Sequence, residues 1–464
     1  MKQLPGKFLQ SLEGLEGFDR EAFEAVHQNK EQVTSIRFNT NKASPFDPDI
    51  PFPFASGGAV PWCKTGFYLA NRPSFTFDPL FHAGLYYVQE ASSMFLEQAI
   101  LSLAVVNQPL KVLDLCAAPG GKSTHLQSLL PEGSLLVSNE VIRTRSNILV
   151  DNLIKWGASN VIVTNNDPAS FQKLTGFFDV IVADAPCSGS GLFRKDNEAI
   201  DEWSPGNVEL CSQRQQRILA DVLPSLKENG LLIYSTCSYS KEEDEFIGNW
   251  LSQSMEMEPL PIALKQEWNI VTVPVGTKEA GYRFYPYRLK GEGFFMACFR
   301  KNAEEKNSKG RRTKIEKATG YELKILQPWI NESSFELVRK EEKFLALPPS
   351  IIDDYELLQS VLRVLYAGVE LGQVMKARLV PAHALALSRI ISHNVPFNEL
   401  LLEEATRYLQ KSDGGLPAQG KGFQLVRYAG QNLGWINVLP NRVNNYYPKE
   451  LRILKQQNDS NFQK

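Results

Sequence analysis

Two cysteines directly follow two apolar runs of the sequence, at positions that suit nucleophilic chemistry. Cys187 lies in the stretch DAPCSGSG and Cys237 in the stretch STCSYS. Neighbouring strands of a sheet lie about 5 Å apart, so two thiols at the ends of such strands could face one small pocket. A thiol near its reference pKa is only a few per cent ionised at neutral pH, but a helix N-terminus lowers that pKa. Because Cys237 precedes the helical stretch KEEDEFIGNWL, we expect its thiol to be activated.

The two thiols, with Asp184 beside them, fit the methylation of a pyrimidine carbon. Carbon 5 of cytosine is a poor nucleophile, but addition of a thiolate to carbon 6 makes the ring enamine-like, so that carbon 5 can attack a sulfonium methyl. The reaction also needs a group that stabilises charge at N3 and N4 and a base that removes the proton from carbon 5. A single cysteine is more often a small buried apolar residue. The cysteines interpreted in this way are Cys63, Cys116, Cys211 and Cys298.

A tight turn predicts a nucleotide-type cofactor site next to the cysteines. The run KVLDLC leads into AAPGGKSTH, where small residues let a ligand approach the backbone and a helix that starts near Lys122 directs free N–H groups at it. Glu140, Asp167 and Asp184 follow at the ends of later apolar runs. Acids at the carboxyl ends of neighbouring parallel strands suit a nucleoside-bearing cofactor. The turn is no Walker loop, because Cys116 stands where the first glycine belongs, whereas spacing alone leaves an NAD site open.

A parallel sheet must position these residues. Short apolar runs alternate with helix-length stretches from residue 111 onward, which predicts an α/β fold whose parallel sheet is covered on both faces. The predicted strands are 111–116, 134–139, 160–165, 178–184, 230–236 and 294–300, and the predicted helices include 144–156 and 212–226. The chain is thereby divided into an N-terminal segment (1–100), a sheet domain (101–301), a basic linker (302–317), a middle C-terminal domain (318–394) and a last domain (395–464).

Composition and charge narrow the classes of protein. A hydrophobic fraction of 43% and a charged fraction of 22% indicate a soluble globular protein. No run approaches the ~20 apolar residues of a membrane span, and the N-terminus lacks an apolar signal core, so we expect a cytoplasmic protein and, since nothing suggests an obligate dimer, a monomer. The cysteines form no CxxC pair and have no histidine at ligand spacing, which predicts no metal site. The five histidines are interpreted as structural, and His82 and His125 have no partner acid in the sequence pattern.

Three motifs together resemble the signature of the Nop/Sun family of RNA cytosine-5 methyltransferases: DLCAAPGGKSTH, DAPCSGSG and YSTCSYSKEEDE. The resemblance covers the catalytic domain and implies a Rossmann-like class I fold that uses S-adenosylmethionine. The stretches LPGKFLQSLEGL, SIRFNTNK and YYVQEASSM resemble the family's N-terminal α+β RNA-binding segment. Residues 421–452 resemble the PUA-like module of the bacterial RsmF (YebU) branch, which modifies 16S ribosomal RNA near the decoding centre. The implied partner is therefore this RNA or the small ribosomal subunit.

The resemblance also implies a role for each catalytic residue. Cys237 would attack carbon 6 of the cytosine, and Cys187 would assist removal of the proton or release of the product. Asp184 would hold the base through N3 and N4, and Lys122 would contact the flipped base.

The implied cofactor site uses the acids and the turn. Glu140 and Asp167 would bind the ribose and adenine ends of S-adenosylmethionine, with Asp184 nearby. The turn around its methionine part would consist of Cys116, Ala117, Ala118, Pro119, Gly120, Gly121 and Lys122.

RNA contacts must offset the few kcal/mol that flipping a base out of its stack costs. The net charge of −2 excludes a uniformly basic binder, so local patches must supply these contacts. Arg194 and Lys195, just past the Cys187 loop, are the RNA-binding candidates.

Other functions stay open. A methyltransferase acting on an exocyclic amine would have [DN]PP[YF] where this chain has DAPC, and it would leave Cys237 without a role. A cytosine-5 methyltransferase of the same family that acts on transfer RNA is an alternative. A non-catalytic RNA-binding factor for ribosome assembly is another, although Cys187, Asp184 and Cys237 are all intact.

Overall fold

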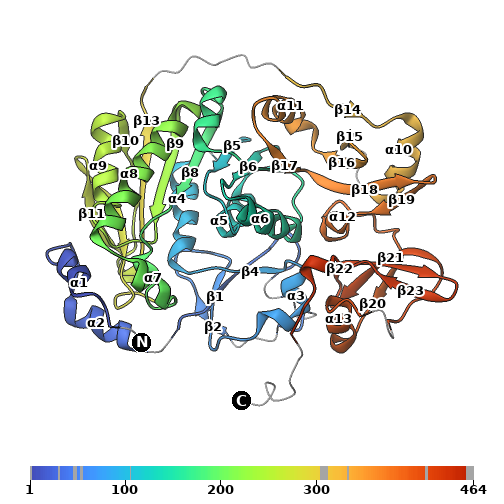
Figure 1. The fold of residues 1–464 in the computed structure, drawn as a ribbon, viewed down its shortest axis with the longest axis horizontal. Coiled ribbons are helices and arrows are strands. Elements are labelled where there is room, and N and C mark those ends of the chain that lie inside the picture. The colour runs from blue at the N-terminus through green and yellow to red at the C-terminus, as the bar shows by residue number, and fades with distance from the viewer. Residues whose placement is uncertain are drawn as a thin grey trace.

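Four β-sheets organise the chain, and the largest of them carries the residues singled out above (Figure 1). The structure is a computed structural model that describes residues 3–29, 32–44, 47, 50–52, 56–104, 106–303, 312–331, 334–412 and 416–455. Residues 304–311 of the predicted basic linker lie outside these described residues. Within the described ranges, no helix is both long and apolar enough to traverse a lipid bilayer.

The central sheet combines parallel strands in its middle with antiparallel strands at both edges. Its order is β11-β12-β13-β9-β8-β5-β6-β7-β17, and β10 pairs with β13. The parallel strands are β5 (Lys111–Asp114), β6 (Leu135–Asn139), β7 (Val161–Thr164), β8 (Phe178–Asp184) and β9 (Leu226–Thr236). The antiparallel strands are β10 (Met257–Pro259), β11 (Val271–Val275), β12 (Lys278–Phe284), β13 (Phe294–Lys301) and β17 (Val364–Ala367). The predicted parallel sheet is confirmed for the middle strands, whereas the short connections from β11 to β13 permit only antiparallel pairing.

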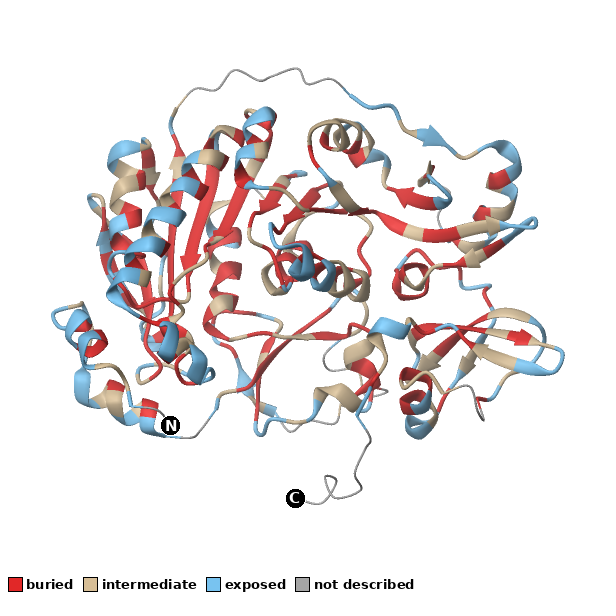
Figure 2. Ribbon diagram, in the orientation of Figure 1, coloured by how far each residue is buried: buried red, intermediate tan, exposed pale blue. Residues whose placement is uncertain are grey.

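Helices cover both faces of the central sheet, whose strands are largely buried (Figure 2). Successive side chains of a strand point to opposite faces, and Val112 and Leu113 accordingly belong to two separate cores. One core includes α4 (Leu96–Leu103), α5 (Gly121–Leu129) and α6 (Arg143–Trp156). The other includes α8 (Pro205–Val222), α9 (Glu245–Ser254) and α11 (Ile352–Val361). Two apolar faces explain why these strands are near-continuous apolar runs in the sequence.

The two predicted helices are present with shifted ends. The helix predicted at 144–156 is α6, and the one predicted at 212–226 is α8, which begins earlier and ends at Val222. Ser204 caps α8, because its Oγ accepts a hydrogen bond of 3.1 Å from the backbone N–H of Asn207. Pro205 occupies the first helical position, where its fixed φ is favourable. These two residues set the start of α8.

The N-terminal segment joins helices to a four-stranded sheet of order β2-β3-β1-β4. Its elements are α1 (Gly6–Leu12), α2 (Arg20–Gln28), β1 (Ser35–Phe38), β2 (Ser56–Ala59), β3 (Gly66–Leu69), α3 (Pro79–His82) and β4 (Tyr86–Val88). The two helices pack against the segments that follow β8 and β9: the ring centroids of Phe8 and Phe193 lie 5.0 Å apart, and those of Phe23 and Tyr239 lie 5.2 Å apart. Short α7 (Asn197–Glu202) also follows β8. The N-terminal helices therefore support both cysteine-bearing segments.

The C-terminal third contains two further sheets. The first, of order β14-β15-β16-β18-β19, consists of Glu316–Lys317, Glu336–Lys340, Lys343–Leu347, Val369–Met375 and Arg378–Pro381, with α10 (Gly320–Leu326) and α12 (His383–Leu387) nearby. The second, of order β20-β21-β22-β23, consists of Phe397–Glu399, Gly422–Tyr428, Gln431–Leu439 and Arg442–Asn445, with α13 (Leu402–Leu409). β17, from the predicted middle domain, pairs with β7 of the central sheet. The middle segment is thus attached to the sheet domain through shared backbone hydrogen bonds, and the five-part division of the chain stays a prediction.

Candidate functional site

The turn after β5 and the carboxyl end of β8 enclose a pocket of about 190 Å³. Parallel strands end at the same edge of a sheet, so residues distant in the sequence meet there. Most of the predicted cofactor turn lines the pocket, together with the segment at and after β4. The lining residues are Tyr87, Val88, Gln89, Glu90, Ser93, Cys116, Ala117, Ala118, Pro119, Gly121, Lys122 and Asp184. Glu140 and Asp167 lie outside this lining, past the ends of β6 and β7 on the same edge.

Gly120 shapes the turn after β5. Its φ of +113° lies in the left-handed region that favours glycine, and α5 begins at the next residue. Beneath the turn, Asp114 is fully buried and its Oδ2 accepts a hydrogen bond of 2.6 Å from Ser123 Oγ. Burial raises the pKa of Asp114 to about 7. Asp114 was not among the predicted site residues, although an acid at the end of the first strand, in KVLDLC, is a signal for it.

The acids past β6 and β7 differ in their surroundings. Glu140 is buried; its Oε1 accepts a hydrogen bond of 2.9 Å from the backbone N–H of Ile142. Its Oε2 has no hydrogen-bond partner among the described residues, and Arg145 Nη1 lies 3.5 Å away. Asp167 is half-exposed and accepts a hydrogen bond of 3.1 Å from the backbone N–H of Ala169. A buried oxygen with spare accepting capacity is suited to a ligand hydroxyl.

Asp184 is held from both sides. Its Oδ2 lies 2.7 Å from Lys122 Nζ, and its Oδ1 accepts a hydrogen bond of 2.7 Å from Ser235 Oγ. The ammonium of Lys122 also lies 5.2 Å from the ring centroid of Phe294. The sequence predicted that Lys122 and Asp184 share one site, and the structure brings them into direct contact. Together they present a carboxylate and an ammonium group to the same pocket.

The two predicted cysteines meet at the same edge. Cys187 Sγ lies 3.1 Å from Cys237 Sγ, and both residues are half-buried. The contact with Cys237, together with burial, holds the pKa of the Cys187 thiol well above its ordinary value. Either thiol can be the donor in this S–H···S contact.

A buried carboxylate, Glu243, links the two cysteine segments. It accepts hydrogen bonds from the backbone N–H of Ser188 at 2.7 Å, from Ser188 Oγ at 2.5 Å and from Ser238 Oγ at 2.7 Å. Gln215 Nε2, from α8, lies 3.3 Å from the same carboxylate. Because Ser188 follows Cys187 and Ser238 follows Cys237, Glu243 fixes the separation of the two thiols. It was missed in the sequence, where KEEDE was interpreted only as the start of a helix.

The predicted helix N-terminus next to Cys237 is wrong. α9 begins at Glu245, and residues 241–244 form a turn. Two side chains of this turn point into the protein. Glu243 accepts hydrogen bonds from Ser188 and Ser238, and Asp244 Oδ1 accepts a hydrogen bond of 2.6 Å from Thr236 Oγ1. Arg283 balances this second buried carboxylate, since its Nη2 lies 3.2 Å from Asp244 Oδ2. Hydrogen bonds to the loops therefore replace the expected helix end in positioning Cys237.

The structure explains why Gly191, the last residue of DAPCSGSG, is a glycine. Its N–H donates a hydrogen bond of 2.8 Å to the carbonyl oxygen of Cys237. A Cβ at this position would lie 2.4 Å from the carbonyl oxygen of Gly293 and 2.8 Å from that of Cys237. The close approach of three backbone segments thus requires glycine and fixes the backbone of Cys237.

The predicted RNA-binding residues are paired with an acid. Arg194 is only 8% exposed and its Nη1 lies 3.4 Å from Glu292 Oε2. Lys195 Nζ lies 3.7 Å from Glu292 Oε1, and its side chain is 30% exposed. Arg194 is therefore first a structural residue of the loop, while Lys195 still reaches the surface. Their contact with RNA stays a prediction.

A second cluster that contains a cysteine lies in the core and includes a histidine of α5. His125 Nε2 is 3.2 Å from Glu97 Oε2, so the expectation that His125 has no partner acid is wrong; the acid comes from α4, 28 residues away in the sequence. Cys63 Sγ lies 3.1 Å from the same oxygen and 3.8 Å from His125 Nε2. Burial lowers the pKa of His125 to about 4, so its imidazole is neutral at pH 7. The three groups contact one another, while His125 Nδ1 has no hydrogen-bond partner among the described residues. Their ligand atoms are also near enough to hold an ion; the absence of a metal stays a prediction.

Comparison with known proteins covers nearly the whole chain. Residues 100–300 match the family model of 16S rRNA methyltransferase RsmB/F, residues 4–91 match the N-terminal domain of 16S rRNA methyltransferase RsmF, and residues 396–453 match the RsmF PUA domain. A ribosomal RNA small subunit methyltransferase F of Aeromonas hydrophila is 32% identical over 84% of this chain and 85% of its own. A protein of the same name from Shewanella piezotolerans is 28% identical over 90% of this chain and 87% of its own.

Solved structures share the fold of the catalytic region. A methyltransferase homologue from Pyrococcus horikoshii is 31% identical, with a TM-score of 0.51, over 64% of this chain and 100% of its own. The NSun6 protein of the same organism, solved with SFG, is 18% identical over 65% of this chain and 99% of its own, with a TM-score of 0.52. At that identity NSun6 supports the fold alone.

Proposed function

Because the chain belongs to the family of ribosomal RNA small subunit methyltransferases F, we propose that it methylates carbon 5 of a cytosine in 16S ribosomal RNA near the decoding centre. Family membership confirms the resemblance to Nop/Sun proteins and the Rossmann-like methyltransferase fold. The observation that carries the choice of carbon 5 is the pair of thiols, with Cys187 Sγ 3.1 Å from Cys237 Sγ. Transfer to a nitrogen would use neither sulfur. The proposal includes the small ribosomal subunit as partner, the cytoplasm as compartment and a monomeric protein.

S-adenosylmethionine fits the edge of the sheet. It supplies a methyl group bound to a positively charged sulfur. Glu140 Oε2, which lacks a hydrogen-bond partner among the described residues, would accept a hydrogen bond from a ribose hydroxyl. Asp167, half-exposed beyond β7, would face the adenine end, and the turn from Cys116 to Lys122 would surround the methionine part.

Attack begins at Cys237. Cys187, with its Sγ 3.1 Å from Cys237 Sγ, would donate its S–H to the Cys237 sulfur and so favour attack by that sulfur. The thiolate then forms a bond to carbon 6 of the cytosine, and the electron pair of the C5–C6 double bond becomes available at carbon 5. Lys122 and Asp184, 2.7 Å apart, would hold N3 and N4 and stabilise the charge that develops on the ring.

Release completes the reaction. Carbon 5 would take the methyl group while the electron pair of the broken S–CH3 bond stays on the sulfur of S-adenosylhomocysteine. The proton of carbon 5 then leaves to a base, and the electron pair of that C–H bond re-forms the C5–C6 double bond. The bond between Cys237 Sγ and carbon 6 breaks, and the sulfur leaves with its electron pair. Cys187 is in contact with that sulfur, so it is placed to assist this step. Glu243 keeps the two sulfurs at this separation throughout the reaction.

The RNA chain must be held while the base is flipped. Lys195, whose side chain is partly exposed, would contact a phosphate near the target. Arg194, buried against Glu292, would act by ordering the loop that carries Lys195. Contacts of this kind must offset a few kcal/mol of unstacking.

A methyl-transfer assay tests the proposal. Purified protein is incubated with labelled S-adenosylmethionine and with 16S RNA, naked or assembled into small subunits, and the RNA is digested to nucleosides and analysed by mass spectrometry. We expect 5-methylcytidine from the wild type and none from Cys237→Ser. Methyl groups on a nitrogen of any base would contradict the proposal, as would methylation of transfer RNA alone. Cofactor binding is checked separately, because S-adenosylmethionine must raise the Tm of a protein that binds it only when folded.

A further inference from the structure

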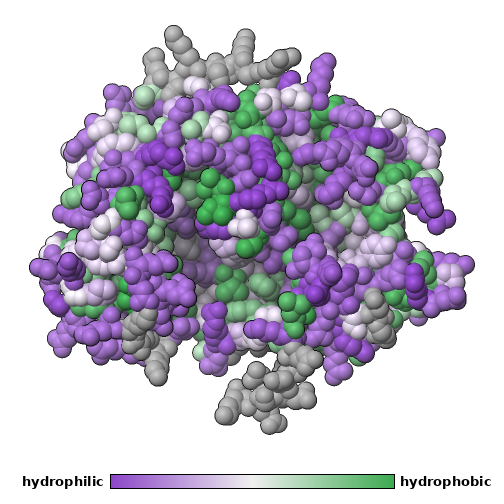
Figure 3. All heavy atoms as spheres, viewed as in Figure 1, coloured by the Kyte–Doolittle hydropathy of each residue, from purple (hydrophilic) through white to green (hydrophobic). Residues whose placement is uncertain are grey.

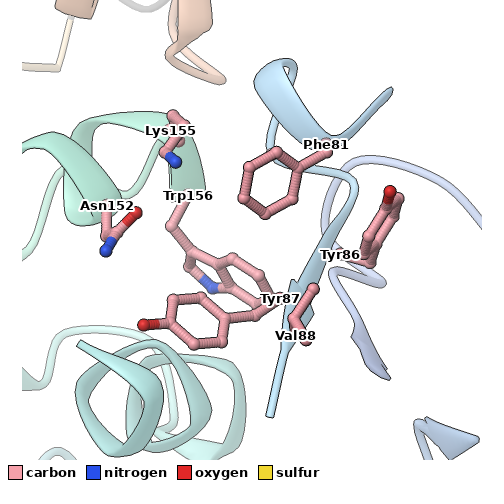
Figure 4. A pocket seen from close by; sticks show the side chains of 8 residues that line it. Phe81, Tyr86, Tyr87, Val88, Asn152, Lys155 and Trp156 are labelled. Carbon is pink, nitrogen blue, oxygen red and sulfur yellow. The ribbon is translucent and has the colours of Figure 1, made fainter. Parts of the chain in front are cut away.

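A second cavity, of about 130 Å³ (Figure 4), shares the lining residues Tyr87 and Val88 with the pocket that contains Asp184. We name it the aromatic pocket. Its walls come from the α3–β4 region and from the last two turns of α6, and Figure 4 shows aromatic rings and an ammonium group gathered around it. The lining side chains are Phe81, Tyr86, Tyr87, Val88, Asn152, Lys155 and Trp156, with Gly84 contributing backbone. In the space-filling view, hydrophobic residues are exposed within a recess in the middle of a mainly hydrophilic face (Figure 3).

The aromatic pocket shares a wall with the pocket that contains Asp184. Tyr87 and Val88 line both the aromatic pocket and the pocket that contains Asp184. The ring of Tyr87 is close to the cofactor turn, since a Cβ at Gly121 would lie 3.3 Å from it. Asn152 belongs to the aromatic pocket, and its Nδ2 donates a hydrogen bond of 2.7 Å to the carbonyl oxygen of Pro119 in the same turn. One strand, β4, therefore separates the two cavities.

The groups around the aromatic pocket offer stacking surfaces and hydrogen-bond donors. Trp156 is buried, and its indole Nε1 has no hydrogen-bond partner among the described residues. The Arg37 guanidinium lies 4.6 Å from the centroid of the Trp156 ring and covers one of its faces. Lys155 Nζ lies 4.6 Å from the ring centroid of Phe81, beside the cavity. Burial lowers the pKa of Lys155 to about 8, so an acceptor or phosphate beside it would favour the charged form.

We propose that the aromatic pocket binds the pyrimidine base of a nucleotide next to the target cytosine. Single-stranded nucleotides are recognised by stacking on aromatic side chains and by hydrogen bonds to base edges. An enclosed apolar cavity of about 150 Å³ accommodates benzene, so a pocket of about 130 Å³ is of the size of one six-membered ring. The oxygen O2 of a pyrimidine is an acceptor for the Lys155 ammonium. The inference rests on the proposed function, because it assumes that RNA enters the neighbouring pocket.

The test uses protein trapped on its substrate. The full-length Cys187→Ala variant is incubated with 16S RNA and S-adenosylmethionine, and the covalent protein–RNA adduct is measured against RNA concentration. Lys155→Gln and Trp156→Phe are each added to this background. We expect the half-saturating RNA concentration to rise about tenfold for each, with unchanged plateau and unchanged Kd for S-adenosylmethionine. Lys265→Gln is the matched control, because Lys265 Nζ also lies beside an aromatic ring, 5.8 Å from the Trp268 centroid, but outside both pockets.

The outcomes distinguish a failure of the proposed methyl transfer from a failure of the proposed base-binding pocket. If the Cys187→Ala parent forms no adduct while it still binds the cofactor, the proposed function fails and not the pocket alone. If the parent is trapped but Lys155→Gln and Trp156→Phe bind RNA like Lys265→Gln, the inference is overturned. A loss of cofactor affinity in both variants also overturns it, since the pocket would then hold adenine. Ultraviolet irradiation of the trapped complex identifies the base: a pyrimidine bound to a peptide with Tyr87 or Trp156 is expected, and attachment only elsewhere contradicts the proposal.

Discussion

Two clusters of this protein hold a thiol in contact with another ionisable group, and they differ in access. At the edge of the sheet, Cys187 Sγ lies 3.1 Å from Cys237 Sγ, and both residues are half-buried. In the core, Cys63 Sγ lies 3.1 Å from Glu97 Oε2, and the residues of that cluster are buried. Burial and the nearby carboxylate raise the pKa of Cys63 to about 12.

The difference shows that contact between reactive groups is not sufficient for chemistry. The core cluster contains a carboxylate, an imidazole and a thiol, which are the groups that many active sites use. Its groups bond to one another, and none of them lines the pocket that contains Asp184. At the edge, by contrast, Glu243 takes the structural role, which leaves both sulfurs available. The predictions below either separate the two clusters further or remove the distinction.

Replacement of one cysteine in each cluster, Cys237 at the edge and Cys63 in the core, should give the largest difference in methyl transfer. Cys237→Ser should lower methyl transfer by about 10⁴-fold or more, because loss of a covalent nucleophile removes the reaction path. Cys63→Ala, in the core cluster, should leave transfer per folded molecule unchanged. Single-turnover methylation of 16S RNA measures both. A strong loss of activity in folded Cys63→Ala would remove the distinction between the clusters.

Glu243→Gln should have the next largest effect. A hydrogen bond to a charged group contributes about 1.5–3 kcal/mol, so looser positioning of the two thiols should lower kcat by about 10- to 100-fold. Binding of S-adenosylmethionine should not change, since Glu243 does not line the cofactor pocket. Glu242→Gln is the matched control, because Glu242 is exposed and adjacent in the sequence. Equal activity of the two variants would show that Glu243 is not needed to position the cysteines.

Glu97→Gln should affect stability alone. The change leaves Cys63 and His125 with a weaker partner in the core, and an unsatisfied buried group costs about 1–3 kcal/mol. Urea denaturation should show that loss in the free energy of unfolding, while methyl transfer at a temperature where the variant is folded stays at the wild-type level. Lost activity without lost stability would assign the core cluster a functional role.

Acid should weaken the fold through the buried histidines. Burial lowers the pKa of His27, His82 and His125 to about 4 and that of His383 to about 3. Between an unfolded pKa near 6.5 and these values the folded state binds fewer protons, so stability is present above pH 6.5 and is lost as the pH falls toward 4. Each such group can contribute up to about 1.4 kcal/mol per pH unit. Unfolding measured at pH 7 and pH 5 should show a smaller difference for His125→Gln than for the wild type.

The cofactor turn and the cysteine segments could be predicted because their chemistry is local in the sequence. Each motif consists of a strand end and the residues directly after it, and the rule that parallel strands end at one edge brings them together. Gly120 and Gly191 were also within these motifs, although only the structure shows which backbone segments Gly191 meets. The strands of the sheet were predictable for the same reason, since two covered faces give near-continuous apolar runs.

Contacts between distant segments could not be predicted in this way. Glu243 binds Ser188 from 55 residues away, and β17 pairs with β7 after about 200 intervening residues. The partner acid of His125 comes from another helix. None of these pairings leaves a spacing or periodicity in the sequence, because each depends on how the elements pack. The wrong helix N-terminus at Cys237 has the same origin, since buried partners draw the acids of KEEDE inward.

Trapping of the covalent intermediate tests the central claim most directly. Wild-type protein, Cys187→Ala and Cys237→Ala are incubated with 16S RNA and S-adenosylmethionine and separated on denaturing gels. The account predicts a denaturation-resistant protein–RNA adduct for Cys187→Ala, because attack by Cys237 proceeds while release is slow, and no adduct for Cys237→Ala. An adduct only with Cys237→Ala would exchange the roles of the two cysteines. A wild type that methylates this RNA while neither variant is trapped would contradict the two-cysteine mechanism.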